Sequence, residues 1–568
     1  MRKLAFLFLS LFAFCTASAQ VTTSSMSGRV ADTDGQPIIG ATIVAVHTPT
    51  GTQYATASTR NGQFNLGGMR VGGPYDVEVS FIGCNTEKIE GIYLTIGEEA
   101  TLDFVLREDS QSIGEVVVVG KANPVFNANR TGAQEVVTLE MMEKLPTTSR
   151  SLDEFVKLTP MSSGKNFAGT SYRFNNVTVD GASFNNSFGL SSALGAQGTE
   201  PISLESIEQV QVMIAPYDVR NGGFTGGGIN SVTKSGTNEW HASAYMYTKS
   251  PELQGHRVRD YVGQVSEFSN RQYGVSLSGP IVKNKLFFFV NGELDRQDEP
   301  ISNRLADSRV SAADLDDLAK FLGDQFNYNP GGYDLSKTET RADRFTARID
   351  WNINDRNTFS LKYYYLKSYN TNAPSTSGAP ANGRGPNAYA MPFSSSYYRT
   401  NNNFNIVMAD WNSTINDHMS NTLKVGYSRL RDYRDMDGGF FPQVDILKDG
   451  SSYTVFGTEA NSYNNQLDTD IFQIQDNFTM NYGNPTSVIE KIVAETPEIV
   501  SCWSITGTSD VIMEVNLPSL EFLSFILASL TRHGKVTTNI VLPGRFKKLD
   551  VKRPREVPKE LLEEQEFK

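Results

Sequence analysis

The sequence predicts a mainly β protein made of several successive modules. Charged residues make up only 20% of the 568 residues, and 47 glycines and 23 tyrosines accompany them, which favours many strands joined by turns. Along most of the chain, apolar and polar residues alternate over short stretches, as in strands with one buried face. Near residue 484 this alternation stops, and helical and strand patterns follow one another instead.

The composition also limits the function. A net charge of −12 argues against nucleic acid as the main partner, because phosphate binding needs basic surface. The three cysteines, Cys15, Cys84 and Cys502, lie far apart without CxxC spacing, so neither a disulfide framework nor a zinc site is indicated. No nucleophile–base or paired-carboxylate arrangement stands out. We therefore expect no metal, no cofactor and no enzymatic activity.

The N-terminus has the order of a secretory signal peptide over residues 1–19. Two basic residues precede an apolar run from Leu4 to Phe14, and small residues lead to a cleavage site after Ala19. Lipidation at Cys15 is an alternative, but bulky Phe14 stands where a small residue is wanted. Later in the chain no stretch reaches about 18 apolar residues, so membrane insertion would require a β-barrel.

Residues 24–107 predict a compact β module. Short alternating strands are separated by an Asp34-Gly35 turn and an Asn61-Gly62 turn, both of which tolerate positive φ. The blocks DTDGQPIIGATI and TRNGQFNL in this stretch resemble the carboxypeptidase regulatory-like domain. The resemblance implies a small, non-catalytic β-sandwich.

An apolar segment on a polar tether follows in residues 110–124. By composition alone it could be one more core strand, but it stands between a complete β module and a differently patterned region. Such a segment can add as a strand to another protein's sheet edge. It resembles a TonB box, which implies a TonB-type energy-coupling protein as partner. The residues of the box are Glu115, Val116, Val117, Val118 and Val119.

Residues 128–236 predict two short helices, at 139–145 and 151–158, followed by strands. A glycine cluster in this stretch could suggest a phosphate-binding loop. That loop needs a helix directly after it, whereas strand-forming residues follow here. The blocks VTVDG, IEQVQV and GGGINSVTK instead resemble the plug domain of TonB-dependent receptors. The corresponding motif residues are Asp180, Gly181, Gly226, Gly227, Gly228 and Asn230.

Residues 238–483 contain long strands with one apolar and one charged face. In Arg344–Ile353, aromatic and aliphatic side chains alternate with Arg, Thr, Asp and Asn, and a turn at 354–357 leads to a second such strand. This pattern fits a lipid face and a wet lumen, with Tyr and Phe near strand ends as interface girdles. A soluble β-sandwich would show the same alternation, so a secreted adhesion or binding protein is the alternative.

The length of residues 238–483 limits how many barrel strands they can form. About 245 residues hold roughly ten strands, whereas plugged transporters use about 22. An unclosed sheet would leave its edge groups unpaired in lipid. We therefore expect a receptor truncated within its barrel, non-functional as a transporter in this form, and joined to a foreign module by a gene-model or assembly fusion.

Residues 485–545 have an α+β pattern and precede a charged tail at 546–568. The run from Pro497 to Leu530 resembles the effector-binding domain of Lrp/AsnC-type regulators, a ferredoxin-like fold whose first strand is missing here. The resemblance places Gly507 and Asp510 near an amino-acid effector site. Because the first strand of that fold is missing, a plain tight turn is the favoured interpretation of these two residues.

Together these patterns predict a β-sandwich, an α+β plug, an incomplete antiparallel transmembrane β-barrel and a short ferredoxin-like segment. We expect an exported outer-membrane TonB-dependent receptor whose partners are an energy-coupling protein, outer-membrane lipid and an unidentified extracellular ligand. The alternatives are a secreted all-β adhesion protein and an amino-acid-binding regulatory module in the C-terminal segment.

Overall fold

The computed structural model describes residues 21–108, 116–119, 132–480 with short internal gaps, 499–504 and 511–515. The predicted signal peptide with Ala19, as well as Glu115, Gly507 and Asp510, lies outside the described residues. Contacts divide the chain into two units, Met1–Asn516 and Leu517–Lys568, and all described residues belong to the first.

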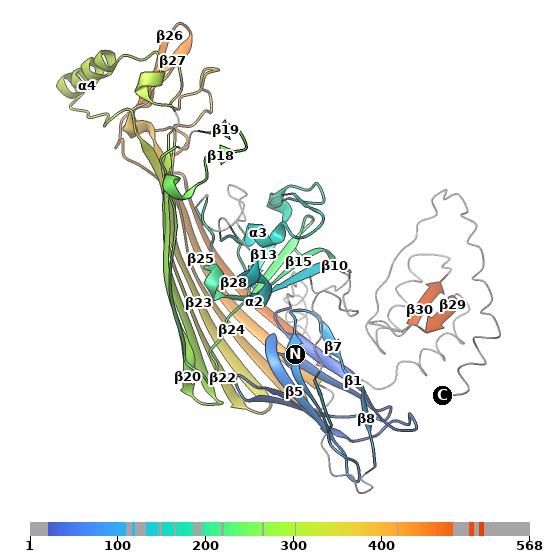
Figure 1. Ribbon diagram of the computed structural model, residues 1–568. Coiled ribbons are helices and arrows are strands. Elements are labelled where there is room, and N and C mark those ends of the chain that lie inside the picture. The colour runs from blue at the N-terminus through green and yellow to red at the C-terminus, as the bar shows by residue number, and fades with distance from the viewer. Residues whose placement is uncertain are drawn as a thin grey trace, which may run out of the picture. The chain divides into compact units, whose positions relative to one another are not determined.

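The N-terminal module is a two-sheet β-sandwich (Figure 1). One sheet has the order β4-β1-β7 with β8 beside β1, and the other has the order β3-β2-β5-β6-β9. The predicted turns are present, since Gly35 and Gly62 have φ values of 76° and 74°. The strands are β1 (Ser24–Asp32), β2 (Thr42–His47), β3 (Thr52–Ala57), β4 (Gln63–Met69), β5 (Gly72–Ser80), β6 (Glu87–Leu94), β7 (Glu99–Thr101), β8 (Phe104–Leu106) and β9 (Val116–Val119).

The second module is a five-stranded mixed sheet with the order β10-β15-β16-β13-β14 and two short helices. Both helices agree with the predicted positions, and the glycine cluster leads into strand β16 as expected. Its elements are β10 (Gly132–Thr138), α2 (Leu139–Lys144), α3 (Leu152–Val156), β11 (Ser162–Ser163), β12 (Asn166–Phe167), η1 (Tyr172–Phe174), β13 (Asn176–Val179), β14 (Ala182–Ser183), η2 (Leu204–Ser206), β15 (Ile207–Pro216) and β16 (Gly228–Thr233). We call this module the plug.

The third module is an eight-stranded antiparallel sheet of long, adjacent strands (Figure 1). Its order is β17-β20-β21-β22-β23-β24-β25-β28, and no pairing joins β17 to β28 among the described residues, so the predicted incomplete barrel is confirmed. Its strands are β17 (His241–Lys249), β20 (Ser269–Val282), β21 (Leu286–Pro300), β22 (Lys337–Asn354), β23 (Asn357–Asn372), β24 (Tyr398–Asn416), β25 (Met419–Met436) and β28 (Gln466–Met480).

The expected number of about ten strands was too high. The strands from β20 onward are 14–19 residues long, well beyond the nine to eleven needed to cross a bilayer. The connections are also unequal. Residues 355–356 alone join β22 to β23, whereas 301–336, 373–397 and 437–465 form long loops at the opposite end.

These three loops fold together into a small structure at one end of the long strands, which we call the cap (Figure 1). Its elements are η4 (Leu305–Asp307), α4 (Ala312–Phe326), η5 (Ser394–Ser396), β26 (Val444–Lys448) and β27 (Ser451–Phe456). A shorter excursion between β17 and β20 contains η3 (Pro251–Leu253), β18 (Arg257–Val258) and β19 (Tyr261–Val262). The strand alternation in residues 238–483 did not predict these elements, α4 among them.

Farther along the chain, β29 (Ile499–Ser504) and β30 (Val511–Val515) form an antiparallel pair. The two strands predicted on either side of residues 507–510 are therefore present. The helix expected before them at 488–493, and the helix and last strand expected after them at 520–530 and 536–542, lie outside the described residues.

Candidate functional site: the faces of the barrel sheet and the plug

The outward face of the barrel sheet is apolar. Side chains at alternate positions of neighbouring strands are partly exposed although they are large and hydrophobic, which a soluble sheet rarely tolerates over such an area. Trp351, Phe359 and Trp411 are cross-strand neighbours in one row near the short-turn end. An apolar band bordered by aromatic residues is typical of strands that face lipid. Further members are Val275, Leu277, Phe345, Ile349, Leu361, Val407, Tyr427, Phe472 and Ile474.

The opposite face of the same strands carries buried charges as well as apolar side chains, and it contacts the plug. Arg344, Arg348, Lys362 and Asp410 are all less than 10% exposed although they are charged. They occupy the alternate positions at which the sequence pattern predicted a lumen. Buried charges of this kind require partners, and part of those partners come from the plug.

Asp180 of the predicted plug motif is the centre of this contact. Its carboxylate lies 3.7 Å from Nζ of Lys362 and 4.0 Å from a guanidinium nitrogen of Arg348, and it accepts hydrogen bonds from Thr233 and Tyr364. Burial disfavours its charged form, but the two cations and the two hydrogen-bond donors outweigh that effect and hold the pKa of Asp180 below its ordinary value. The plug therefore carries a buried carboxylate that stays ionised.

The charges around Asp180 continue into the barrel wall. Lys362 also pairs with Asp410, and Arg348 pairs with Asp350 at 2.8 Å while donating to the backbone oxygen of Thr233 at 2.6 Å. Both cations that face Asp180 therefore also have a carboxylate partner within the barrel, Asp410 for Lys362 and Asp350 for Arg348.

A second polar contact lies elsewhere on the same sheet face. Arg344 pairs with Glu293 at 2.6 Å and with Asp295 at 3.2 Å, and its Nε donates to the backbone oxygen of Glu200 in the plug at 2.6 Å. Ser203 of the plug donates to Glu293 at 2.7 Å. Two separate sets of charges therefore join plug and barrel.

One aromatic contact accompanies the polar ones. The Phe184 ring of the plug, which is fully buried, meets Tyr364 and Phe404 of the barrel edge-on, with centroid distances of 5.6 and 5.3 Å. Edge-to-face pairs of this kind add about 0.5–1.5 kcal/mol each beyond their buried area.

The glycines of the plug motif are needed for close packing. A Cβ on Gly227 would lie 2.4 Å from the Phe167 ring, and one on Gly226 would lie 2.4 Å from the Asn175 side chain. Asp180 and Gly181 turn the chain in left-handed conformations, with φ values of 51° and 86°. Gly228 begins β16, and Asn230 within that strand is 1% exposed. The structure thus brings Asp180, Gly181, Gly228 and Asn230 together in the sheet of β13 and β16.

The predicted TonB-box segment is described at the backbone level. Val116–Val119 forms β9, which pairs in parallel with β6 from Glu87↔Val116 to Glu90↔Val119. Strand β9 is therefore the last strand at one edge of the sandwich sheet.

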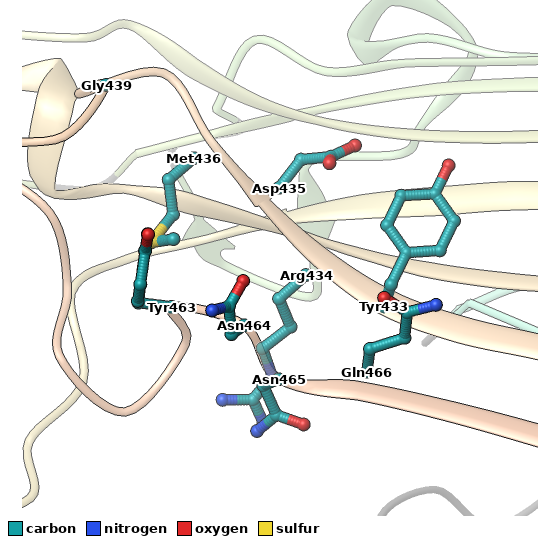
Figure 2. A pocket seen from close by; sticks show the side chains of 9 residues that line it. All are labelled: Tyr433, Arg434, Asp435, Met436, Gly439, Tyr463, Asn464, Asn465 and Gln466. Carbon is teal, nitrogen blue, oxygen red and sulfur yellow. The ribbon is translucent and has the colours of Figure 1, made fainter.

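A shallow pocket of about 350 Å³ lies at the foot of the cap, where β25 ends and β28 begins (Figure 2). Arg434 donates to Ser462 at 3.1 Å, and Asp435 accepts from Asn401 at 2.9 Å. The lining combines aromatic, amide and charged side chains from Tyr433, Arg434, Asp435, Met436, Gly439, Tyr463, Asn464, Asn465 and Gln466.

The sequence analysis singled out Asp180 but not its partners. The alternation in Arg344–Ile353 placed Arg344 and Arg348 on the lumen face, yet nothing in the spacing showed that Lys362 would meet a plug residue 182 positions earlier. In the part of the chain that is described, no cluster of three or more His, Cys, Asp or Glu could hold a metal ion. Within the same residues, no helix is long and apolar enough to cross a bilayer.

Comparison with known protein families agrees with this architecture. Residues 25–107 match the carboxypeptidase regulatory-like domain, and residues 232–332 and 299–487 match an outer membrane beta barrel domain. Residues 480–548 match the Lrp/AsnC ligand binding domain. The chain thus carries an accessory N-terminal domain followed by a region that matches an outer membrane β-barrel domain.

Individual relatives narrow the class further. The chain is 26% identical over 276 residues to the TonB-dependent transporter Oar of Myxococcus xanthus, covering 44% of this chain and 25% of that protein. It is 29% identical over 184 residues to the probable TonB-dependent siderophore receptor PirA of Acinetobacter baumannii, covering 28% of this chain and 22% of that protein. The chain is thus similar to TonB-dependent receptors and transporters. It spans about a quarter or less of the length of these two relatives.

A solved structure shows a weaker likeness. The outer membrane transporter YddB of Escherichia coli matches 62% of this chain and 46% of its own, with a TM-score of 0.43 and 14% identity. The curated relatives are named as receptors and transporters, not as enzymes.

Proposed function

We propose that the chain carries the gate of an energy-coupled outer-membrane receptor, whose barrel is truncated and therefore non-functional as a transporter in this form. In this proposal the segment Val116–Val119 binds a TonB-type energy-coupling protein, and residues 128–236 occlude the barrel until that protein pulls on them. The ligand enters from the cap side. The observation that carries the proposal is the network around Asp180, because a plug held by exchangeable polar contacts can leave the barrel wall and become hydrated.

The position of β9 supports the role of the box. A parallel pair at a sheet edge is slightly weaker per residue than an antiparallel pair, and β9 has only four residues. A partner that offers its own strand edge can therefore compete with β6 for these residues.

Backbone pairing gives a direct test. Val117→Pro removes one N–H from the segment and prevents strand addition at that position. We expect it to weaken binding of the full chain, in detergent, to the periplasmic domain of a TonB-type protein by at least tenfold. Ala122→Pro, in the linker just after the segment, is the matched control and should bind like the unaltered chain. Equal affinity for both variants would contradict the proposal.

The pocket at the foot of the cap is our candidate for the first ligand contact. The name of the PirA relative makes ferric siderophores the class to test first. Titration with a ferric catecholate and a ferric hydroxamate, followed by quenching of protein fluorescence, should show binding that Arg434→Ala reduces several-fold. Glu239→Gln, a change at an exposed residue that does not line the pocket, serves as the control. Equal quenching of both variants would show that the pocket is not the ligand contact.

The family match at residues 480–548 supports a second candidate function, amino-acid binding by the C-terminal segment. Gly507 and Asp510 are the residues that the resemblance assigns to it. Calorimetric titration of the full chain with the common amino acids should give heat that Asp510→Ala abolishes. Absence of heat with the unaltered chain would argue against this function.

A further inference from the structure

The carboxypeptidase regulatory-like domain contacts both the plug and the barrel sheet, which a merely tethered accessory domain would not do. The contacts lie at the end of the sheet where the strands are joined by short turns. Asn352 donates to Thr52 at 2.8 Å, and the backbone N–H of Asn238 donates to the carbonyl oxygen of Pro49 at 2.8 Å. Short turns are found at the periplasmic end of outer-membrane barrels.

Arg70 joins the three modules at one point. From the end of β4 its guanidinium reaches Asp350 of the barrel at 3.1 Å and Ser235, just after plug strand β16, at 3.0 Å. Asp350 is 1% exposed and is the same carboxylate that pairs with Arg348. The charge network at the plug–barrel contact therefore extends into the N-terminal domain.

A buried glutamine of the plug forms a second connection. Gln209 of β15, which is 4% exposed, accepts from the backbone N–H of Ile96 at 3.0 Å and donates to the carbonyl oxygen of Leu94 at 3.0 Å. Its side-chain amide thus pairs with the backbone of the N-terminal domain as a strand would. An apolar cluster also joins the two modules, formed by Val71, Ile96, Val136 and Val232, each 5% exposed or less.

The first described residues of the chain form a third connection. The carbonyl oxygen of Val21 accepts from the Asn230 side chain at 2.6 Å, and the Thr22 hydroxyl pairs with Lys424 of the barrel. Both Val21 and Thr22 are less than 10% exposed. Asn230 of the plug motif therefore binds backbone of the N-terminal segment.

From these three connections we propose that the carboxypeptidase regulatory-like domain retains the plug in the barrel. Arg70, Gln209 and Asn230 are the residues through which it does so. The plug can leave its place only when this domain separates from β15, β16 and Asp350. The proposal goes beyond the energy-coupled gate, because it concerns the resting chain and requires neither ligand nor energy-coupling protein.

Hydrogen exchange of the full chain in detergent tests the proposal. Arg70→Met removes the contacts with Asp350 and Ser235 while keeping an unbranched apolar side chain. A charged hydrogen-bond partner lost from a buried site corresponds to roughly a tenfold to hundredfold change in an opening equilibrium. We therefore expect amides of Ile207–Pro216 and Gly228–Thr233 to exchange at least tenfold faster in Arg70→Met.

The matched control is Arg29→Met, the same change at an exposed residue of the same domain that contacts only Gly35 through its guanidinium. It should leave plug exchange unaltered. Amides of β2 and β5 report whether the domain itself stays folded and should be equally protected in both variants. Plug exchange within twofold of the unaltered chain in Arg70→Met would overturn the proposal.

A second measurement does not depend on a weakened variant. In the double variant Thr52→Cys, Asn352→Cys, oxidation should link the N-terminal domain to the barrel where the two side chains now touch. If the domain retains the plug, the oxidised protein will show slower exchange in β15 and β16 than the same protein after reduction. Equal exchange in the oxidised and reduced forms would overturn the proposal, whatever the effect on uptake.

Discussion

The cap and the plug–barrel interface are both buried, but different contacts hold them together. The cap has a core of aromatic and aliphatic side chains, in which Tyr328 and Phe441 stack with centroids 3.8 Å apart and Phe393 is fully buried. The interface combines ionised groups around Asp180 with an apolar cluster, in which plug side chains such as Phe184 pack with barrel side chains such as Leu366 and Phe404. An apolar core gives its stabilisation only while it stays dry, whereas separated charges can each be hydrated again.

This difference suggests which part of the molecule moves. Separating the cap loops would expose a large apolar surface, so we infer that the cap keeps its shape during function. Separating the plug from the barrel would expose part of a shared apolar cluster too, but it would also release charged side chains that water solvates well. The buried charges contribute little net stability compared with apolar packing, but they make the interface exchangeable.

The largest effect is expected from a cavity in the cap. Phe393→Ala removes a buried ring that packs against Tyr333 and Phe456, and should destabilise the cap by about 3–5 kcal/mol. Limited proteolysis of residues 301–336 and 437–465 would detect this. Phe440→Ala changes a ring that is 88% exposed and should leave the cleavage rate unaltered. Similar cleavage of both variants would show that packing in the cap core does not keep the cap loops folded.

The sequence predicted the modules well because their signals are local. The Asp34-Gly35 turn, the glycine cluster before β16 and the alternation in β22 each act over a few residues. A local signal also existed for α4, since Leu315, Leu318 and Leu322 recur at helical spacing, but the loop composition around it concealed that pattern.

The site was less predictable because its partners are distant in sequence. The motif identified Asp180, but its cations come from strands β22 and β23, and only the register of the sheet brings Arg348 and Lys362 to the same row. The attachment of Arg70 to Asp350 likewise joins residues 280 positions apart. Alternation assigns a residue to the lumen face without saying which charge it will meet there.

The second prediction compares the two faces of the barrel sheet. Val407 lies on the apolar face of β24 and is 40% exposed. Val407→Lys should destabilise the inserted sheet by roughly 2–4 kcal/mol near the middle of the bilayer, because the ammonium group would face lipid. Folding into lipid vesicles, followed by gel mobility without heating, measures this loss. Val407→Ile should insert normally, and normal insertion of the lysine variant would argue that this face does not contact lipid.

The third prediction concerns the polar interface. Asp180→Asn keeps the shape of the side chain but removes the charge that Lys362 and Arg348 face. Because both cations retain barrel carboxylates, we expect a loss of about 2 kcal/mol rather than the larger cost of an unpaired buried charge. Faster hydrogen exchange in β13 and β16, with the cap unchanged, would show it. Glu143→Gln, on the exposed side of α2, is the control, and equal exchange in both variants would mean that the charge network does not hold the plug.

The smallest effect is expected from pH, and it arises in the N-terminal domain. Burial, together with the nearby Arg70, lowers the pKa of His47 from 6.5 to about 3, so the imidazole is neutral in the fold. The folded state therefore binds fewer protons than the unfolded state between these two pKa values. The free energy of unfolding of the domain is therefore highest above pH 6.5 and decreases as the pH falls toward 3.

At pH 5.5 this linkage should reduce the stability of the domain by roughly 1 kcal/mol relative to pH 8. Exchange of β2 and β5 amides, corrected for the intrinsic rate, would measure it. His47→Gln retains a polar partner for Thr50 but does not titrate, so its exchange should not change between the two pH values. Among its described residues, the apolar core of the cap contains no imidazole, so the cap should not share this particular response. A pH response that persists in His47→Gln would mean that other titratable groups of the domain cause it.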